Sequence, residues 1–305
     1  MGPPVDADLL ARHADFVTEG VRERAFFVDL AGTRCLAILD HPAGRPPSGM
    51  GFVVCHAFGD EFVNLRRIER DVARTLARLG HPVLTFHRRG YGDSEGSPDA
   101  GVPEHLQEVR EAMSYVTAEA GADRVGLIGA RFGALVAGLA AREGGVDRLL
   151  LVNPSLRGMP LFRELARHVL IAQLADDQGA PGAEGDLLSR LETEEVAEVL
   201  GYPLYRSVFE GFGPVDLTTD VGSFNGQALV LQVTRSSRVP PDVQAFASAV
   251  ESRGGQCTVE LLPEPPGTRF GQKPFQNVAE STIRRNIQRP VQEAISERAA
   301  EWVSR

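Results

Sequence analysis

The sequence predicts an α/β fold in which a mostly parallel, twisted sheet is covered by helices on both faces. Short apolar runs of strand length alternate along the chain with segments whose apolar residues recur at helical spacing. Such an alternation requires crossover connections, and these make neighbouring strands parallel. The apolar runs are continuous, as expected for strands that are buried on both faces.

The elements follow in a regular order up to residue 153. Residues 25–30 and 34–39 are predicted to pair as an antiparallel hairpin, with Gly32 in the turn. The strands that follow are expected at 50–55, 82–86, 125–128 and 149–152, with helices over 62–79, around 106–116 and directly after residue 130.

The alternation stops between residues 154 and 225, where helical segments and loops but no clear strand are found. It resumes with a strand at 228–233, a helix at 241–253, a strand at 257–262 and a last helix from about 290 to 302. We therefore expect residues 1–153 and 226–305 to form the core and residues 154–225 to form an inserted helical lid.

The strongest local motif is Gly129-Ala-Arg-Phe-Gly133, between a predicted strand and a predicted helix. Its glycine spacing and setting resemble the nucleophile elbow of α/β-hydrolases, G-x-S-x-G, and predict that fold. The middle residue is Arg131 instead of serine. A guanidinium stays protonated near neutral pH and cannot attack a carbonyl carbon.

The other two positions of a Ser-His-Asp triad are also unfilled. In this fold the histidine follows the last strand, yet none of the seven histidines lies beyond His168. Residues 234–240, where the triad acid is expected, contain no carboxylate, and Asp242 is the nearest one. We therefore expect that the chain is not a Ser-His-Asp hydrolase.

Several stretches resemble one group of α/β-hydrolase-like proteins, those associated with bacterial exosortase systems and close to the serine aminopeptidases and acyl hydrolases. The resemblance covers roughly residues 25–303, and in some of these relatives an arginine also replaces the elbow serine. His87 stands where such sequences often have aspartate. The similar stretches are His56-Ala-Phe-Gly-Asp-Glu61 with Asn64, Arg66 and Arg67, then Arg89-Gly-Tyr-Gly-Asp-Ser-Glu-Gly96, Gly201-Tyr-Pro-Leu204 and Lys273-Pro-Phe275.

Arg131 has two interpretations. Free N–H groups at a helix start favour an anion, and arginine adds a planar donor set for carboxylate or phosphate, so Arg131 could clamp an anionic substrate. Alternatively, it pairs with a buried carboxylate such as Asp60 or Glu61. The backbone N–H groups of Ala57, Phe58 and Phe132 are candidates for holding an oxyanion.

Proton transfer would fall to Glu61 or His87, since a partly buried carboxylate or an imidazole can act as acid or base. Glu61 could equally serve in an ion pair, and His87 could be a turn histidine. His56 is a candidate catalytic group or a structural residue of its loop. Asp60, Tyr202 and Tyr205 complete the set of residues expected to bind substrate or to form the lid core.

Three functions remain open. A non-hydrolytic enzyme would act on an acyl, polyketide-like or carboxylate-bearing small molecule by cyclisation, elimination, isomerisation or acyl transfer, in bacterial secondary metabolism. A catalytically inactive pseudo-hydrolase would serve as a binding or scaffold protein. A hydrolase or thioesterase with relocated catalytic residues is the third. The retained lid and the ionisable residues gathered at one sheet edge favour the first.

The composition narrows the partners. The net charge of −9 argues against nucleic acid, which needs a basic surface. We expect no membrane segment, since no apolar run reaches the roughly 18 to 20 residues of a spanning helix. Three widely spaced cysteines give neither a disulfide framework nor a metal pattern, so we expect a cytoplasmic protein without metal or cofactor. The antiparallel edge and the last helix are the surfaces where a homodimer would form.

Overall fold

The computed structural model describes residues 14–175, 187–265, 270 and 278–305. Strands and helices alternate along them as predicted. The strands are β1 (Asp15–Thr18), β2 (Val21–Leu30), β3 (Thr33–Pro42), β4 (Gly49–Cys55), β5 (Val83–Phe86), β6 (Ala122–Ala130), β7 (Arg148–Val152), β8 (Val196–Val199), β9 (Tyr202–Tyr205), β10 (Gln227–Thr234) and β11 (Gln256–Pro263). The helices are α2 (Asp60–Arg78), α3 (Val102–Glu119), α4 (Phe132–Glu143), α5 (Gly158–Ala175), α6 (Leu187–Thr193), α7 (Arg206–Phe212), α8 (Pro241–Ser252) and α9 (Val278–Val303).

The main sheet has nine strands among the described residues, in the order β1-β2-β3-β5-β4-β6-β7-β10-β11. The first three strands are antiparallel to one another, and β3 pairs antiparallel with β5. From β5 to β11 every pair is parallel. The predicted mostly parallel sheet is confirmed, and its antiparallel edge is one strand longer than expected, because residues 15–18 add to the hairpin.

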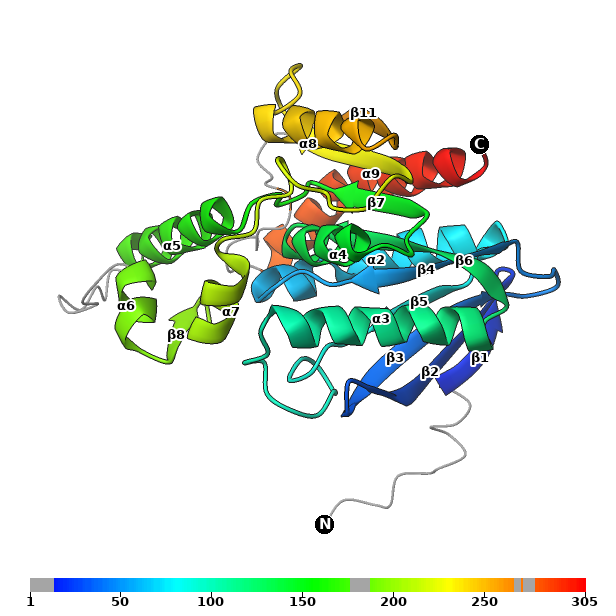
Figure 1. The fold of residues 1–305 in the computed structure, drawn as a ribbon, viewed down its shortest axis with the longest axis horizontal. Coiled ribbons are helices and arrows are strands. Elements are labelled where there is room, and N and C mark those ends of the chain that lie inside the picture. The colour runs from blue at the N-terminus through cyan, green and yellow to red at the C-terminus, as the bar shows by residue number, and fades with distance from the viewer. Residues whose placement is uncertain (1–13, 176–186, 266–269, 271–277) are drawn as a thin grey trace, which may run out of the picture.

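Helices cover both faces of this sheet (Figure 1). The apolar side of α2 packs with α9 on one face, around Leu65, Val72 and Ile295. Helices α3, α4 and α8 cover the other face, where residues such as Leu135 and Phe246 are fully buried. The sheet is therefore packed between two apolar layers. This packing fixes the strand ends and the side chains that they carry.

The segment between β7 and β10 contains α5, α6, α7 and a two-stranded antiparallel sheet, β8-β9. The predicted helices are present, but the expectation that this segment contains no strand was wrong. Residues 196–199 alternate between exposed and buried side chains, the period of a half-buried strand. Leu200 and Gly201 between the strands both have positive φ, 52° and 87°, as a tight hairpin turn requires.

Candidate functional site

The turn from β6 into α4 is a sharp one centred on Arg131, whose φ of 53° and ψ of −121° are strained for a residue with a side chain. Both flanking glycines are required by space. A Cβ on Gly129 would lie 2.4 Å from the carbonyl oxygen of Gly133, and a Cβ on Gly133 would lie 2.0 Å from that of Cys55. The motif is thus a fully formed elbow that presents its middle side chain above the sheet edge.

Backbone hydrogen bonds hold this turn against the neighbouring strand. The Arg131 N–H donates to the carbonyl of Val152 at 3.3 Å, and the Arg131 carbonyl accepts from the N–H of Ser155 at 3.2 Å. The chain leaving β7 for α5 therefore braces the elbow from one side. The position of the Arg131 Cα is consequently fixed by the sheet rather than by its own side chain.

The Arg131 guanidinium lies between two carboxylates from different parts of the chain. Its Nε is 2.8 Å from Oε1 of Glu61, in the first turn of α2, and its Nη2 is 2.7 Å from Oε1 of Glu164, on α5. The side chains of Arg131 and Glu61 are 10% and 6% exposed, whereas that of Glu164 is 36% exposed. The cluster is therefore buried on the sheet side and reaches solvent on the α5 side.

Charge is not balanced in this cluster, because one guanidinium faces two carboxylates. Burial lowers the pKa of Arg131, but the carboxylates of Glu61 and Glu164 outweigh it and raise the pKa above the usual value. Arg131 is therefore charged throughout the physiological range. Its Nη1 group has no hydrogen-bond partner among the described residues, so these two N–H donors remain for a bound molecule.

Glu61 is the acid of the cluster whose protonation the fold alters most. Burial raises the pKa of its carboxyl, Arg131 lowers it in part, and the negative charges of Glu164 and Asp60 raise it further. Such a carboxyl binds a proton more readily than a solvated glutamate. It is therefore a better base once it is ionised.

The loop after β4 and the start of α4 come together beside this cluster. The Phe58 and Phe132 rings meet edge to face, with centroids 6.0 Å apart, and both residues are buried. Nη2 of Arg88 donates to the carbonyl of Ala57 at 3.2 Å and its guanidinium lies over the Phe132 ring. The backbone N–H of Phe132 opens α4, where helix amides lack intrahelical acceptors. These contacts hold the loop at Ala57 and Phe58 against the start of α4 at Phe132.

His56 and His87 form a second cluster, in which both imidazole rings meet the Phe62 ring edge to face. Nδ1 of His56 is 2.5 Å from Oε2 of Glu69, a buried pair. Nε2 of His87 accepts a hydrogen bond from Nη1 of Arg66, and its Nδ1 is buried without a partner in the described residues. Burial, with the nearby charges of His56 and Arg66, lowers the pKa of His87 to about 3. His87 is therefore neutral near pH 7, and Arg66 occupies the ring nitrogen that would accept a proton.

No hydrogen bond or ion pair joins His56 or His87 to Arg131 or Glu61 in the part of the chain that is described. The sequence-derived candidates thus divide into two groups. Arg131 and Glu61 are in direct contact, while the two histidines have structural partners of their own.

The remaining candidates lie around the entrance to α2. Asp60 is buried and accepts from Nδ2 of Asn64 at 3.4 Å. Tyr202, at the start of β9, reaches this loop, since a Cβ on Gly59 would lie 3.8 Å from the Cβ of Tyr202. Tyr205 packs against the main apolar core just before α7. Tyr202 therefore lies against the loop before α2, whereas Tyr205 packs on the apolar core.

Comparison with known proteins agrees with this geometry. A family profile described as alpha/beta hydrolase fold matches residues 52–181, the stretch that contains the loop after β4, the elbow and α5. The structure also resembles those of known esterases over nearly its whole length.

The chain has the α/β-hydrolase fold.

Three solved structures illustrate the likeness. Est1E from Butyrivibrio proteoclasticus is 17% identical, with a TM-score of 0.58 over 92% of this chain and 99% of that one. An esterase from Pyrococcus furiosus, Pf2001, is 15% identical, with a TM-score of 0.59 over 100% and 94%. A serine hydrolase homologue from Coxiella burnetii is 15% identical, with a TM-score of 0.53 over 94% and 98%. No curated protein matches the sequence.

In this α/β-hydrolase fold, residues that the sequence analysis did not single out lie next to the elbow. Glu164 lies on α5, and only its tertiary position makes it a partner of Arg131. Arg88 follows His87 directly and packs between Tyr91 and Phe132. Ser155, bonded through its backbone to Arg131, has a buried hydroxyl without a partner among the described residues. A serine or threonine after β7 carries no recognisable motif, so only the structure reveals it.

In the loop after β11, residues 266–269 and 271–277 lie outside the described residues, and with them the stretch Lys273-Pro-Phe275. Among the residues described, no cluster of histidine, cysteine and acidic side chains has the arrangement of a metal site. Nor does any helix in the described ranges combine the length and apolarity needed to cross a membrane.

Proposed function

We propose that the chain hydrolyses the ester or thioester bond of a small acyl or carboxylate-bearing molecule, with a water molecule activated by Glu61 in place of a serine nucleophile. The observation that carries this proposal is the position of Glu61. It is an almost fully buried carboxyl with a raised pKa, hydrogen-bonded to the residue in the nucleophile's place.

The reaction would proceed by addition of water and elimination of the leaving group, without an acyl-enzyme. The ionised Glu61 carboxylate takes a proton from water as the water oxygen attacks the carbonyl carbon. Backbone N–H groups at Phe132 and in the loop at Ala57 and Phe58, together with the Nη1 donors of Arg131, hold the developing oxyanion. Collapse breaks the bond to the leaving oxygen or sulfur, and Glu61 returns the proton to it. General-base assistance of this kind contributes typically 10²–10⁴-fold in rate.

The names of structurally similar proteins support hydrolysis. Pf2001 is called an esterase, and the Coxiella protein a serine hydrolase homologue. Those neighbours favour hydrolysis over cyclisation, elimination, isomerisation or acyl transfer, the chemistry that the sequence favoured. The two histidine candidates are left out of the mechanism, because His56 is paired with Glu69 and His87 is neutral and bonded to Arg66.

A second candidate, a pseudo-hydrolase that binds its ligand without turnover, is favoured by one observation. Arg131 holds Glu61 and Glu164 together, so the elbow, α2 and α5 are tied by one guanidinium. A protein without catalytic activity would retain these two ion pairs because they stabilise the fold.

Activity measurements separate the two. The wild-type chain is assayed against p-nitrophenyl esters and acyl thioesters of short, medium and aromatic acids, with and without a fluorophosphonate probe. We expect turnover that the probe does not inhibit, and no labelled serine. Arg131→Ser should not gain serine-type activity, since among the described residues no imidazole is hydrogen-bonded to Arg131. Stoichiometric labelling of Ser155 with loss of activity would replace Glu61 by a relocated nucleophile, and absence of turnover on every substrate would favour the pseudo-hydrolase.

A further inference from the structure

A cavity lies at the opposite edge of the sheet from the elbow, where the parallel strands begin. It has a volume of about 420 Å³ and is lined from the start of β4, β6 and β7, from the loops before β4 and β5, and from the end of α9. This volume is within the range of small-molecule sites, about 300–1,000 Å³. The lining residues are Arg45, Ser48, Met50, Leu79, His81, Arg124, Arg148, Val303 and Ser304.

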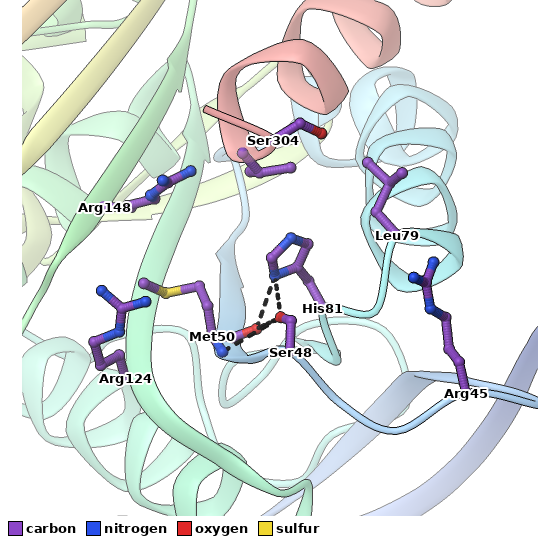
Figure 2. Close-up of a pocket in the computed structure, with 9 residues that line it drawn as sticks. Arg45, Ser48, Met50, Leu79, His81, Arg124, Arg148 and Ser304 are labelled. Atoms are coloured by element: carbon purple, nitrogen blue, oxygen red, sulfur yellow. Dashed lines mark hydrogen bonds between the residues drawn. The ribbon is translucent and has the colours of Figure 1, made fainter.

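Three arginines surround this cavity. Arg124 and Arg148 lie beside each other on one wall, and Arg45 comes from the opposite side, with His81 between them (Figure 2). The proximity of Arg124 and Arg148 changes the pKa of Arg148. Burial lowers the pKa of Arg148, the positive charge of Arg124 lowers it further, and the negative charge of Asp147 raises it in part. Like charges held together in this way repel each other unless an anion lies between them.

The three guanidinium groups have no ion-pair partner within 4.0 Å among the described residues, although the chain carries a net charge of −9. Arg45 donates to the carbonyl of Arg78, and Arg148 to that of Trp302. Arg124 has no hydrogen-bond partner in the described part of the chain. The three arginines therefore differ from those that pair directly with carboxylates, such as Arg70 and Arg89.

Polar groups other than arginine also face the cavity. Nδ1 of His81 lies 3.1 Å from the Met50 carbonyl and 2.7 Å from the Ser48 hydroxyl, which fixes the ring. The other ring nitrogen points into the cavity (Figure 2). A neighbouring hollow of about 340 Å³ shares Arg124 and Arg148 and contains one carboxylate, Asp147. The arginines therefore remain in excess along the whole depression.

We propose that this basal cavity binds a phosphorylated small molecule, whose phosphate lies between Arg124 and Arg148 and is reached from the other side by Arg45. Planar guanidinium donors match phosphate oxygens in bidentate geometry, which a lysine would not do. The concave shape favours a small ligand over a nucleic acid or membrane surface, and the overall negative charge disfavours both of those. This site is separate from Glu61 and Arg131, and it does not depend on the proposed hydrolysis.

Isothermal titration with inorganic pyrophosphate tests the proposal on the full chain. We expect saturable binding at one site, weakened by added salt. Arg124→Gln is the cleanest variant because the residue is exposed and makes no hydrogen bond or ion pair with the described residues. It should weaken binding about tenfold or more, the effect of losing a hydrogen bond to a charged group. The double variant Arg124→Gln/Arg148→Gln should bind still more weakly.

The matched control removes two arginines far from the cavity. Arg110 and Arg289 are exposed and pair with Glu143 and Glu293, so Arg110→Gln/Arg289→Gln has the same net charge as the double variant. Its affinity should equal that of the wild type. Equal loss in the control, absence of saturable binding in the wild type, or binding of heparin or DNA but not pyrophosphate would each overturn the proposal. Arg124→Lys keeps the charge without the planar fork and should fall between wild type and Arg124→Gln.

Discussion

Nε of Arg131 donates to Oε1 of Glu61 across 2.8 Å, so the elbow and the first turn of α2 are joined by a buried ion pair. The two residues are 70 positions apart in the sequence. Adjacent parallel strands bring them together, since β4 precedes α2 and β6 precedes the elbow. The pair therefore places a fixed positive charge and a perturbed carboxyl where a hydrolase of this fold carries its nucleophile.

Removing the positive charge should destabilise the protein strongly. Arg131→Met leaves Glu61 buried without its cation, and breaking a buried pair costs about 3 to 5 kcal/mol. In the variant the folded-state pKa of Glu61 is raised further, so the protein binds more protons folded than unfolded and loses stability as pH rises. We expect a larger deficit at about pH 8 than at about pH 5 in urea unfolding. Arg142→Met, which removes a half-exposed pair with Asp220, is the control and should cost little at either pH. An equal deficit at both pH values would show that the loss comes from packing.

Glu164 should tune the site without serving as its base. Its negative charge raises the pKa of Glu61, so Glu164→Gln should lower that pKa. Because Glu61 must be ionised to accept a proton, the acidic limb of the kcat/KM profile lies above the usual glutamate pKa of about 4.3 in the wild type. In Glu164→Gln the limb should move to lower pH with the maximal rate retained. A limb that stays in place would mean that another group controls it.

Asp40 makes a separate prediction about stability. It is buried on β3 opposite Glu23, and burial, reinforced by the Glu23 charge, raises the pKa of its carboxyl to about 7. Below the usual value of 3.8 the group is protonated in both states, and between 3.8 and about 7 only the folded state keeps the proton. Stability should therefore fall as pH rises through this range. Asp40→Asn should be more stable than wild type above about pH 7, with the gain vanishing near pH 4. Asp29→Asn, at an exposed position of the same hairpin, should show no such trend.

Local patterns in the sequence predicted the core of the fold well. The periods of strands and helices can be read from neighbouring residues. The spacing of Gly129 and Gly133 marks a tight turn, because a strand and a helix approach each other closely there. The β8–β9 hairpin was missed because each strand has only four residues, although Leu200-Gly201 is a recognisable turn signal. A four-residue alternation is too short to be distinguished from a loop or a helical turn by period alone.

The site was predicted only in part, for a physical reason. The contact between Arg131 and Glu61 was one of two interpretations open from the sequence, because the fold places the two strand ends side by side. Glu164 depends on how α5 lies over the elbow, which no local pattern encodes. The role expected of His87 depended on a free ring nitrogen, and Arg66, in the second turn of α2, is hydrogen-bonded to that nitrogen. Ion-pair and hydrogen-bond partners of this kind depend on the tertiary structure, so the sequence pattern alone does not reveal them.

The comparison of Glu61→Gln with Glu164→Gln tests the central claim most directly. Both changes remove one carboxylate from the same guanidinium and keep the side-chain volume, so they differ only in which acid is lost. On the best ester or thioester substrate, we expect Glu61→Gln to lower kcat by about 10²-fold or more, while Glu164→Gln retains it within a few-fold. Rapid mixing of the wild type should show linear product release with no burst, and no acyl adduct by intact mass. Retained turnover in Glu61→Gln, or a burst with an acylated protein, would contradict the account.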